Sequence, residues 1–454
     1  MTEPASPHPT AAPAPATSPS QPAPPSSFGA SPGDVSDPFG DSPDASFGVG
    51  NTGADTLEMD ERAPAEQPEP DGATDAALGM WALVFAGGIG SRFWPLSTPE
   101  RPKALLALVG ERPLIAESVL RLAPLVPPER VLVLTSADIA DALHTAIPDV
   151  PAANMLVEPR PMGTAASLAW GAQEVARRAG PATPLVAVHA DLAVGYPDEL
   201  RRLLAQAARL ASEEPALVVI GAEPTRPEPG FGYVVPNAAL DVDEGAAELL
   251  TPKPLADEGD ALPPLPGATP RTAARRVSRF VEKPAPLLAD QLITDGAFWH
   301  TGILVANAGQ VLAALAERTP ELQPGMAALA ANKFDRFAGM IQSVSLERGL
   351  LERSPDLVVL PGAFGWDDVG TWAALRRVRE LDDTGNGVWG RAHLLDASSS
   401  VVHADGGGTV VLYGVSGVLV VARPGLTFVT TLERAASLAP LLESLPDELR
   451  TGLR

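Results

Sequence analysis

The chain has no cysteine among its 454 residues, so disulfide bonds and thiolate metal sites are excluded. It also lacks any run of about 18 apolar residues, the length that a membrane-spanning helix needs. No basic stretch followed by an apolar segment occurs near its start, so we expect no secretory signal and a cytoplasmic protein. Basic residues are few, with 33 Lys and Arg against 56 Asp and Glu and a formal net charge of −23. This charge disfavours nucleic acid and anionic membranes as partners, and any anionic substrate needs a local basic pocket.

Two common nucleotide-binding patterns are absent as well. The sequence does not contain the phosphate-loop pattern in which a glycine and any four residues precede Gly-Lys-Ser or Gly-Lys-Thr. Phe93 stands where the dinucleotide fingerprint requires its third glycine. A phosphate-binding loop in this chain must therefore be of another kind.

A glycine-rich segment of that other kind follows the first apolar stretch. Residues 82–86 predict a buried strand, which continues as Gly87-Gly88-Ile89-Gly90-Ser91-Arg92. Glycines allow a tight turn whose N–H groups face an anion, and an arginine adds a planar charged fork suited to phosphate oxygens. Lys103, in Arg-Pro-Lys, supplies a second cation. These residues predict a site that holds a nucleoside triphosphate by its phosphates.

Composition divides the chain into segments. Residues 1–77 carry 13 Asp and Glu against one Arg and are rich in Pro, Ala and Ser, which predicts a disordered acidic leader. Residues 78–383 alternate apolar strands with helical stretches, which predicts an α/β fold with a mostly parallel sheet and helices on both faces. Within this region, residues 237–275 predict a surface insertion. Residues 384–454 predict a β-rich module with a terminal amphipathic helix. Helices are expected at 309–332, 345–353 and 432–445.

Carboxylates occur at two places where a metal could bind. Asp191 follows the predicted strand 185–190, at the edge of a parallel sheet where ligands bind. It could hold Mg²⁺ against phosphates or cap a turn. Asp367 and Asp368 lie between glycines just before a predicted helix, which is consistent with a second metal ligand or with a capped helix start.

The string from Gly87 to Lys103 resembles the signature of the sugar-1-phosphate nucleotidyltransferases. Its Phe-Trp-Pro-Leu form is most similar to the mannose-1-phosphate guanylyltransferase branch, and the resemblance extends over about residues 80–435. It implies a Rossmann-like nucleotidyltransferase sheet followed by a short C-terminal β-helix-like module. It implies that Arg92 stabilises departing pyrophosphate and that Lys103 lies near the α-phosphate. The residues implied to hold the triphosphate are Gly87, Gly88, Gly90 and Ser91.

The same resemblance assigns the metal and the sugar phosphate. It implies Asp191 and Asp368 as Mg²⁺ ligands. It implies contacts to the sugar phosphate from Gly232, Glu282, Lys283 and His300. Glu-Lys-Pro at the end of a strand is otherwise common as a solvated turn. His300 stands where the family usually has Asn, and this difference leaves the identity of the sugar open.

Glu158 bears on the choice of base. It ends the predicted strand 155–158 and precedes Gly163-Thr164-Ala165, at the start of a predicted helix. A carboxylate can accept hydrogen bonds from both N1–H and the 2-amino group of guanine, whereas uracil and thymine offer mixed edges. Glu158 and Thr164 are therefore candidate nucleotide-binding residues. The alternative is a structural ion pair of Glu158 with a cation such as Arg160.

The sequence thus predicts an enzyme that uses GTP and mannose 1-phosphate to form GDP-mannose and pyrophosphate, with Mg²⁺ as cofactor. A homodimer through the C-terminal module is also expected. One alternative is a glucose-1-phosphate uridylyl- or thymidylyltransferase. Another is a catalytically silent regulatory paralogue that binds sugar nucleotides, which is suggested by departures from the family pattern at 162–163, 190, 192 and 300.

Overall fold

The computed structural model describes residues 79–213, 216–239 and 274–450. The leader predicted over 1–77 and most of the insertion predicted over 237–275 lie outside the described residues. No helix in the described part of the chain is long and apolar enough to cross a membrane.

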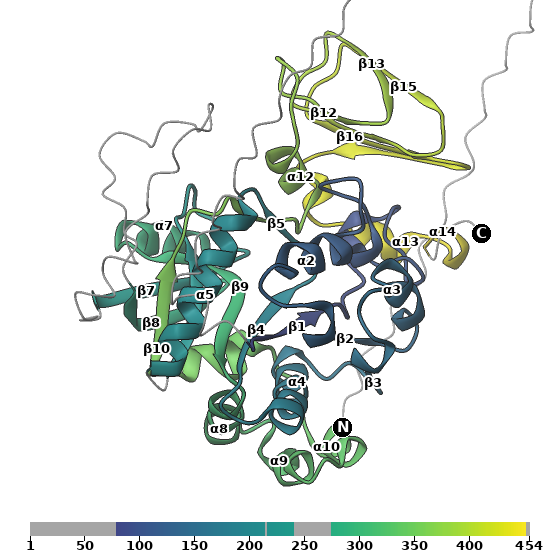
Figure 1. Cartoon of the computed structure of the whole chain (residues 1–454). Coiled ribbons are helices and arrows are strands. Elements are labelled where there is room, and N and C mark those ends of the chain that lie inside the picture. The colour runs from purple at the N-terminus through teal and green to yellow at the C-terminus, as the bar shows by residue number, and fades with distance from the viewer. Residues whose placement is uncertain (1–78, 214–215, 240–273, 451–454) are drawn as a thin grey trace, which may run out of the picture. The chain divides into compact units, whose positions relative to one another are not determined.

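A nine-stranded sheet forms the centre of the fold (Figure 1). In spatial order its strands are β3 (Met155–Glu158), β2 (Val131–Ser136), β1 (Trp81–Phe85), β4 (Pro184–His189), β9 (Phe298–Asn307), β6 (Leu217–Ala222), β10 (Leu357–Pro361), β8 (Arg275–Glu282) and β7 (Gly232–Ala239). β9 runs antiparallel to β4 and β6, and β8 runs antiparallel to β10 and β7. The other seven strands of this sheet share one direction. The prediction of a mostly parallel α/β sheet is confirmed.

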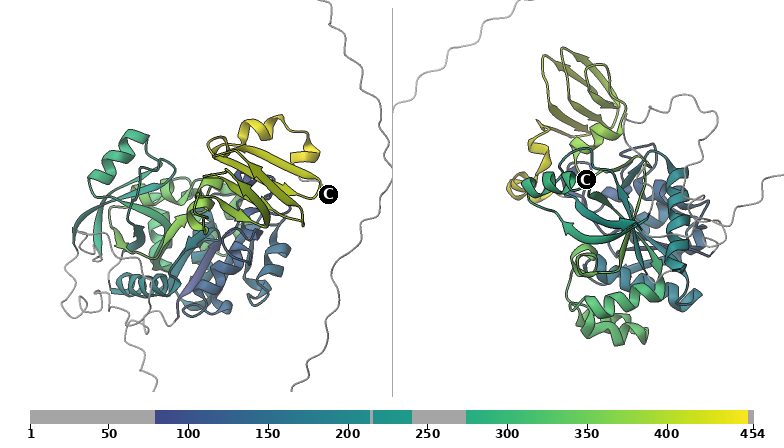
Figure 2. Two further views of the ribbon diagram at one scale, coloured as in Figure 1. Left: turned by 90° about the horizontal axis from the view of Figure 1, so that it is seen from above. Right: turned by 90° about the vertical axis from the view of Figure 1, so that its left-hand side faces the viewer.

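Helices cover both faces of the sheet (Figures 1 and 2). Alternate side chains of a strand point to opposite faces. Ala82 and Val84 of β1 therefore pack in one core cluster, with helices α2 (Leu114–Leu122), α3 (Ala140–Ala146) and α5 (Pro197–Glu213). Leu83 and Phe85 pack in another cluster, with α4 (Thr164–Ala179), α8 (Ala308–Arg318), α9 (Gln323–Ala330), α10 (Phe334–Met340) and α11 (Leu346–Gly349). Burial on both faces explains why β1 is apolar throughout. Helix α7 (Pro286–Thr294) packs on β7 in a smaller cluster.

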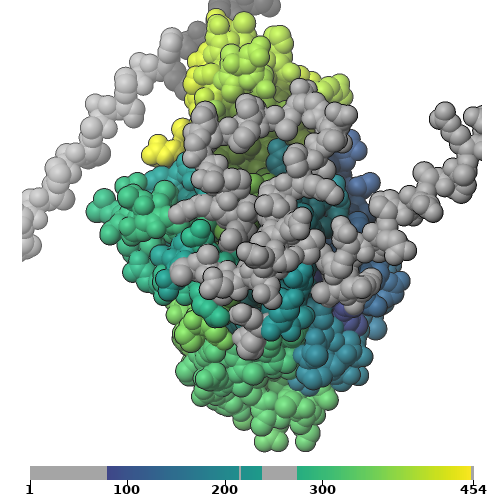
Figure 3. Space-filling view, turned by 60° about the vertical axis from the view of Figure 1, so that its left-hand side comes forward, coloured from purple at the N-terminus to yellow at the C-terminus, as the bar shows by residue number. Residues whose placement is uncertain are grey.

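The C-terminal strands coil in a β-helix-like manner. β12 (Gly387–Trp389), β14 (Val401–Ala404) and β16 (Val418–Arg423) pair in parallel, and so do β13 (Arg391–Leu395) and β15 (Thr409–Tyr413). β17 (Leu426–Thr431) then pairs antiparallel with β16 and ends the coil. Figure 1 shows these yellow-green strands at one end of the described molecule and α9 and α10 at the other, and Figure 3 shows yellow-green and green atoms at the corresponding ends.

The Phe-Trp-Pro-Leu segment that follows the glycine loop packs against the C-terminal part of the chain. The Phe93 ring lies 5.2 Å from that of Trp372, at the start of α12 (Trp372–Val378). The Trp94 ring lies 5.2 Å from Phe428 of β17, and its Nε1 donates to the carbonyl of Leu449 at 3.1 Å. These contacts anchor the segment after the loop, so this part of the motif serves packing.

Three predicted helices differ in the structure. The stretch 309–332 splits into α8 and α9, because Pro320 and Pro324 lie at and just after the break, and proline cannot continue a helix. The stretch 345–353 forms α11 and a separate 3₁₀ turn, Leu351–Arg353. The prediction of one helix over 432–445 is wrong. A 3₁₀ turn at Arg434–Ala436 is followed by α13 (Ala439–Ser444), with Pro440 in its first turn, and then by α14 (Asp447–Arg450).

Candidate active site

Two cavities that share two lining residues lie at the carboxyl ends of β1, β3 and β4. The first, of about 580 Å³, is lined by Gly87 and Gly88 after β1 and by Glu158 at the end of β3. The second, of about 320 Å³, is lined by residues from more distant segments: Asp191, Gly232, Glu282, Lys283, His300, Glu347 and Asp368. Thr164 and His189 line both. The first is called the loop cavity below and the second the carboxylate cavity.

The glycine loop and Lys103 are packed together. Gly90 has a φ of 71°, which favours glycine, and a Cβ at this position would lie 2.4 Å from the Cβ of Lys103. The Lys103 N–H donates to the carbonyl of Ile89 at 3.0 Å. Gly90 is therefore required for the close approach of the lysine, whereas Gly87 and Gly88 face open space at the loop cavity.

Four of the predicted phosphate-binding residues do not line either cavity. They are Gly90, Ser91, Arg92 and Lys103. Ser91 and Arg92 are exposed in the 3₁₀ turn Ser91–Phe93, and the Arg92 guanidinium contacts no acidic group among the described residues. Lys103 is buried, and its Nζ lies 2.6 Å from Oδ2 of Asp191, which brings it to the edge of the carboxylate cavity.

A short antiparallel pair brings the two predicted metal ligands together. β5 (Leu192–Val194) pairs with β11 (Trp366–Asp368) so that Asp368 lies opposite Leu192, next to Asp191. Burial favours a higher pKa for Asp191, but the charges of Lys103 and His189 hold it below its ordinary value. Burial raises the pKa of Asp368, and the negative charge of Asp191 raises it further. The positive charge of Lys103 acts in the opposite direction. The two carboxylates thus line the cavity together, and Lys103 forms an ion pair with Asp191.

These oxygen donors fit a Mg²⁺ ion, which prefers carboxylates and takes further ligands from water and phosphates. Among the described residues no cluster of three or more His, Asp or Glu forms a complete protein site for a metal. A metal held here would therefore need a substrate or water to complete its shell.

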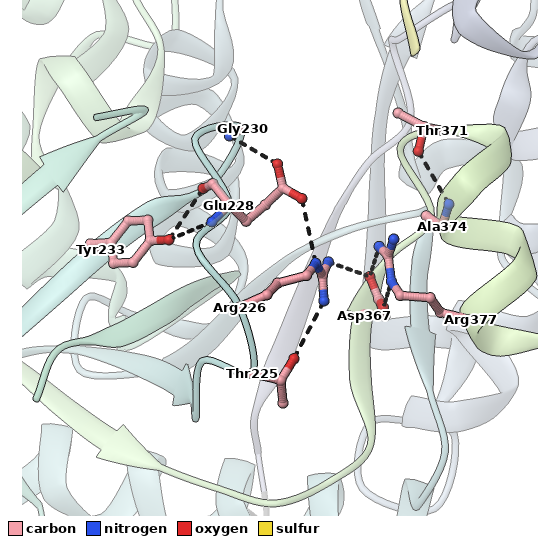
Figure 4. A network of polar contacts seen from close by, with 9 residues as sticks. All are labelled: Thr225, Arg226, Glu228, Gly230, Tyr233, Asp367, Thr371, Ala374 and Arg377. Carbon is pink, nitrogen blue, oxygen red and sulfur yellow. Dashed lines mark hydrogen bonds and ion pairs between the residues drawn. The ribbon is translucent and has the colours of Figure 1, made fainter. Parts of the chain in front are cut away.

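A separate network fixes the segment that carries Asp368 (Figure 4). The neighbouring Asp367 accepts two hydrogen bonds from Arg377 of α12, at 2.7 and 2.8 Å, and lies 3.9 Å from Arg226. Arg226 also lies 3.6 Å from Glu228 and 4.9 Å from the ring centroid of Trp299. Because two arginines engage Asp367, Asp368 is the carboxylate that remains directed to the cavity.

Glu158 lines the loop cavity. Its Oε1 accepts a hydrogen bond from the hydroxyl of Ser167 in α4. Burial raises the pKa of Glu158, although hydrogen bonds from Ser167 and the Met162 backbone oppose the shift. Arg160 instead donates to the carbonyls of Ala338 and Ile341 at 2.6 and 2.9 Å. An ion pair between Glu158 and Arg160 is thus not part of the described structure.

Thr164 begins α4 directly after Gly163. Its hydroxyl accepts a hydrogen bond from the N–H of Leu346 at 2.8 Å. Gly163 has a φ of 84°, and a Cβ there would lie 2.4 Å from the carbonyl of Val344. The start of α4 is therefore held against the segment that leads into α11.

Glu282 and Lys283 both line the carboxylate cavity. Glu282 ends β8 opposite Gly232 of β7, where a Cβ would lie 2.9 Å from Oε2 of Glu282, so the absence of a side chain at Gly232 leaves room for the carboxylate. Lys283 pairs with Glu282, but 56% of its side chain remains exposed. Burial raises the pKa of Glu282, and the charges of Glu347 and Glu352 add to the shift despite the hydrogen bond from Lys283.

His300 is buried on the cavity wall, and neither ring nitrogen has a hydrogen-bond partner among the described residues. Burial lowers its pKa to about 4, although Glu347 opposes this shift. In the unfolded chain the imidazole binds a proton near pH 6.5, whereas the folded protein resists protonation down to about pH 4.

We therefore expect the free energy of unfolding to fall as the pH decreases from 6.5 to 4. His300→Asn should reduce this fall because it removes the titrating group. Urea unfolding of both proteins at pH 7, 5.5 and 4.5 measures the difference. The same pH dependence in the two proteins would contradict the expectation.

His189 and Glu347 are among the cavity residues that were not predicted as site residues from the sequence. His189 belongs to no motif, and the sequence indicates only a structural or surface role for it, although it lies two residues before Asp191. Glu347 lies in the short helix α11, where burial favours a higher pKa but His300 and His189 hold it below the ordinary value. No local motif marks Glu347, because only tertiary packing brings α11 to the cavity.

Comparisons with known proteins show which family and which fold the chain resembles. The family described as nucleotidyl transferase matches residues 81–262 and 267–384. A crystal structure described as a mannose-1-phosphate geranyltransferase from Thermus thermophilus superposes with a TM-score of 0.67 at 30% identity, covering 80% of this chain and 98% of that one.

Curated relatives show lower identity over most of the chain. The mannose-1-phosphate guanylyltransferase of Sinorhizobium fredii is 27% identical over 385 residues, which cover 81% of this chain and 68% of the relative. The mannose-1-phosphate guanylyltransferase of Escherichia coli is 27% identical over 386 residues, which cover 81% of this chain and 74% of the relative. The xanthan biosynthesis protein XanB of Xanthomonas campestris is 28% identical over 357 residues, which cover 75% of this chain and 67% of the relative.

Proposed function

Since the chain belongs to the nucleotidyl transferase family, we propose that it transfers a guanylyl group from GTP to mannose 1-phosphate, forming GDP-mannose and pyrophosphate. The observation that carries the proposal is the pair of cavities that share Thr164 and His189. A nucleotide in the loop cavity and a sugar phosphate in the carboxylate cavity would meet at these two residues. The names of the relatives support guanine and mannose as the specific substrates.

In the proposed reaction a phosphate oxygen of mannose 1-phosphate attacks the α-phosphorus of GTP in line. The bond from the α-phosphorus to its bridging oxygen breaks, and pyrophosphate leaves with the electron pair. Such transfer depends on position and charge neutralisation more than on covalent help from the protein. The N–H groups of Gly87, Gly88, Gly90 and Ser91 would hold the triphosphate. The exposed Arg92 is free to close on the departing pyrophosphate.

The carboxylate cavity would orient the sugar phosphate. The exposed ammonium of Lys283 would bind its phosphate, and Glu282, Gly232 and His300 would contact the sugar. Lys103, ion-paired with Asp191, would stand near the α-phosphate. Asp191 and Asp368 would hold Mg²⁺, which when bound neutralises phosphate charge. The net negative protein thereby supplies a local positive site for anionic substrates.

A pyrophosphate-release assay tests the proposal directly. The full chain is incubated with Mg²⁺ and each of GTP, UTP, dTTP and ATP, in turn with mannose 1-phosphate and glucose 1-phosphate. The highest kcat/KM is expected for GTP with mannose 1-phosphate. A higher kcat/KM for UTP or dTTP with glucose 1-phosphate would contradict the proposed substrates and indicate a uridylyl- or thymidylyltransferase. Release from none of these pairs would favour a catalytically silent sugar-nucleotide-binding protein.

Glu158→Gln tests the choice of base. The amide offers one acceptor oxygen where the carboxylate offers two, so one charge-assisted hydrogen bond to guanine is lost. Such bonds are worth roughly 1.5–3 kcal/mol, and we expect kcat/KM for GTP to fall about 10- to 100-fold. The measured quantity is the ratio of kcat/KM for GTP over UTP in both proteins.

Ser167→Ala is the matched control, since it removes the hydrogen bond to Glu158 and keeps the carboxylate. It should change the GTP to UTP ratio less than Glu158→Gln does. An unchanged ratio in Glu158→Gln would remove this residue from the base site.

A further inference from the structure

His189 has no role in the mechanism above, yet its position is special. It ends β4 and lines both cavities, a property that it shares with Thr164. The Thr164 hydroxyl already accepts a hydrogen bond from the Leu346 N–H. The His189 ring, in contrast, hydrogen-bonds to nothing within the described ranges of the chain. A half-buried imidazole without a partner at the junction of two cavities is available to a ligand.

The surroundings hold this ring in place by packing. Its centroid lies 5.4 Å from that of Phe85, with the planes inclined by 53°. On another side lies Gly302, where a Cβ would come within 3.1 Å of Cδ2 of His189. Gly302 has a φ of 75°, so the backbone at this point also favours glycine. Packing on carbon atoms positions the ring without using its nitrogens.

Acidic residues surround the His189 ring on the side of the carboxylate cavity. The carboxyls of Asp191, Asp368 and Glu347 line the carboxylate cavity together with His189, so the ring lies among acidic groups. A hydrogen-bond donor in this place offsets part of the repulsion between these carboxylates and a phosphate. Its contribution needs only one N–H, which a neutral imidazole also has.

We propose that His189 donates a hydrogen bond to the phosphoryl group that passes between the two substrates. The proposal rests on the proposed function, because the α-phosphate of the nucleotide must meet the sugar phosphate where the two cavities join. A donor that lines both cavities can keep its hydrogen bond to one phosphoryl oxygen while the α-phosphorus exchanges its bond to pyrophosphate for a bond to the sugar phosphate. Donors aimed at the charge that develops in the transition state lower the barrier, so the effect should appear in kcat.

Three variants of the full chain test this. His189→Phe keeps an aromatic ring against Phe85 but removes both nitrogens. His189→Gln restores an N–H donor of similar reach. His393→Gln, on the exposed strand β13 outside both cavities, is the matched control. For each variant kcat and the KM of both substrates are measured by pyrophosphate release, together with Tm.

We expect His189→Phe to lower kcat about 10- to 100-fold with Tm close to that of the original chain. The decrease in log kcat should be at least a third smaller in His189→Gln than in His189→Phe. The His393→Gln control should have the same kcat and Tm as the original chain. The proposal is overturned if His189→Phe keeps full kcat. It is also overturned if only the KM of one substrate changes, or if Gln and Phe lose the same activity together with Tm.

Failure of the proposed function gives a different result. In that case the original chain itself releases no pyrophosphate from any substrate pair. Calorimetric titration with GTP, with and without mannose 1-phosphate, then tests His189 by affinity. A five-fold or greater loss of GTP affinity in His189→Phe, with recovery in His189→Gln, supports the phosphate contact, and any smaller change overturns it.

Discussion

Asp368→Asn is expected to lower kcat by at least about 100-fold while the protein stays folded. The β5–β11 pair places this carboxylate beside Asp191, where burial and the neighbouring charge already raise its pKa. An amide keeps the shape but removes the charge that would hold Mg²⁺. The same loss is expected for Asp191→Asn. Pyrophosphate release is measured over a range of Mg²⁺ concentrations, with Tm as the measure of folding.

The adjacent Asp367 provides the control. It differs by one position and is engaged by Arg377 and Arg226, so Asp367→Asn should affect Tm more than kcat. If Asp368→Asn keeps the original turnover at the same Mg²⁺ concentration, Asp368 is not a ligand. If Asp367→Asn shows the larger loss of kcat, the assignment of the two residues is reversed.

Lys103→Met is expected to reduce both turnover and stability. Its ammonium is 2.6 Å from Asp191, and only 7% of its side chain is exposed. Removing one member of a buried ion pair leaves a charge without compensation, which typically costs about 3–5 kcal/mol. Because a third of the Asp191 side chain is exposed, we expect a smaller loss, about 1–3 kcal/mol. Turnover should fall about 100-fold or more, since the cation nearest the proposed α-phosphate site is lost.

A double variant separates the two effects. Lys103→Met combined with Asp191→Asn removes both charges, so it should be more stable than Lys103→Met alone in urea unfolding. It should nevertheless be as inactive as either single variant. Full activity in Lys103→Met would show that this lysine serves only the fold. A double variant no more stable than Lys103→Met would show that the unpaired carboxylate is not the source of the instability.

The local elements of this protein followed from its sequence because their causes are local. Strand β1 is apolar at every position, which is how a strand covered on both faces must read. Prolines also act locally, and the helix expected over 309–332 divides at Pro320, whereas Pro324 lies in the first turn of α9, where proline is tolerated. The helix predicted over 432–445 was wrong for a related reason, since Pro440 marks the first turn of a new helix.

The glycine loop and the motif residues were also predictable, although their partners were not. The spacing of Gly90 and Lys103 gives no sign that the glycine exists to admit the lysine Cβ. Phe93 and Trp94 belong to the same motif, but they pack on Trp372 and Phe428, which lie far along the chain. Contacts of this kind depend on the path of the whole chain, which no pattern of neighbouring residues contains.

The sequence by itself thus determined the α/β class, the strand-and-glycine loop and the family to which the motifs point. It could not decide between Asp367 and Asp368 on physical grounds, or identify His189 and Glu347 as cavity residues. Those outcomes depend on the register of β5 with β11, on the arginines that engage Asp367 and on the docking of α11. Periodicity reports which face a side chain takes, whereas a site is made of the distances between side chains on different elements, and only tertiary packing sets these distances.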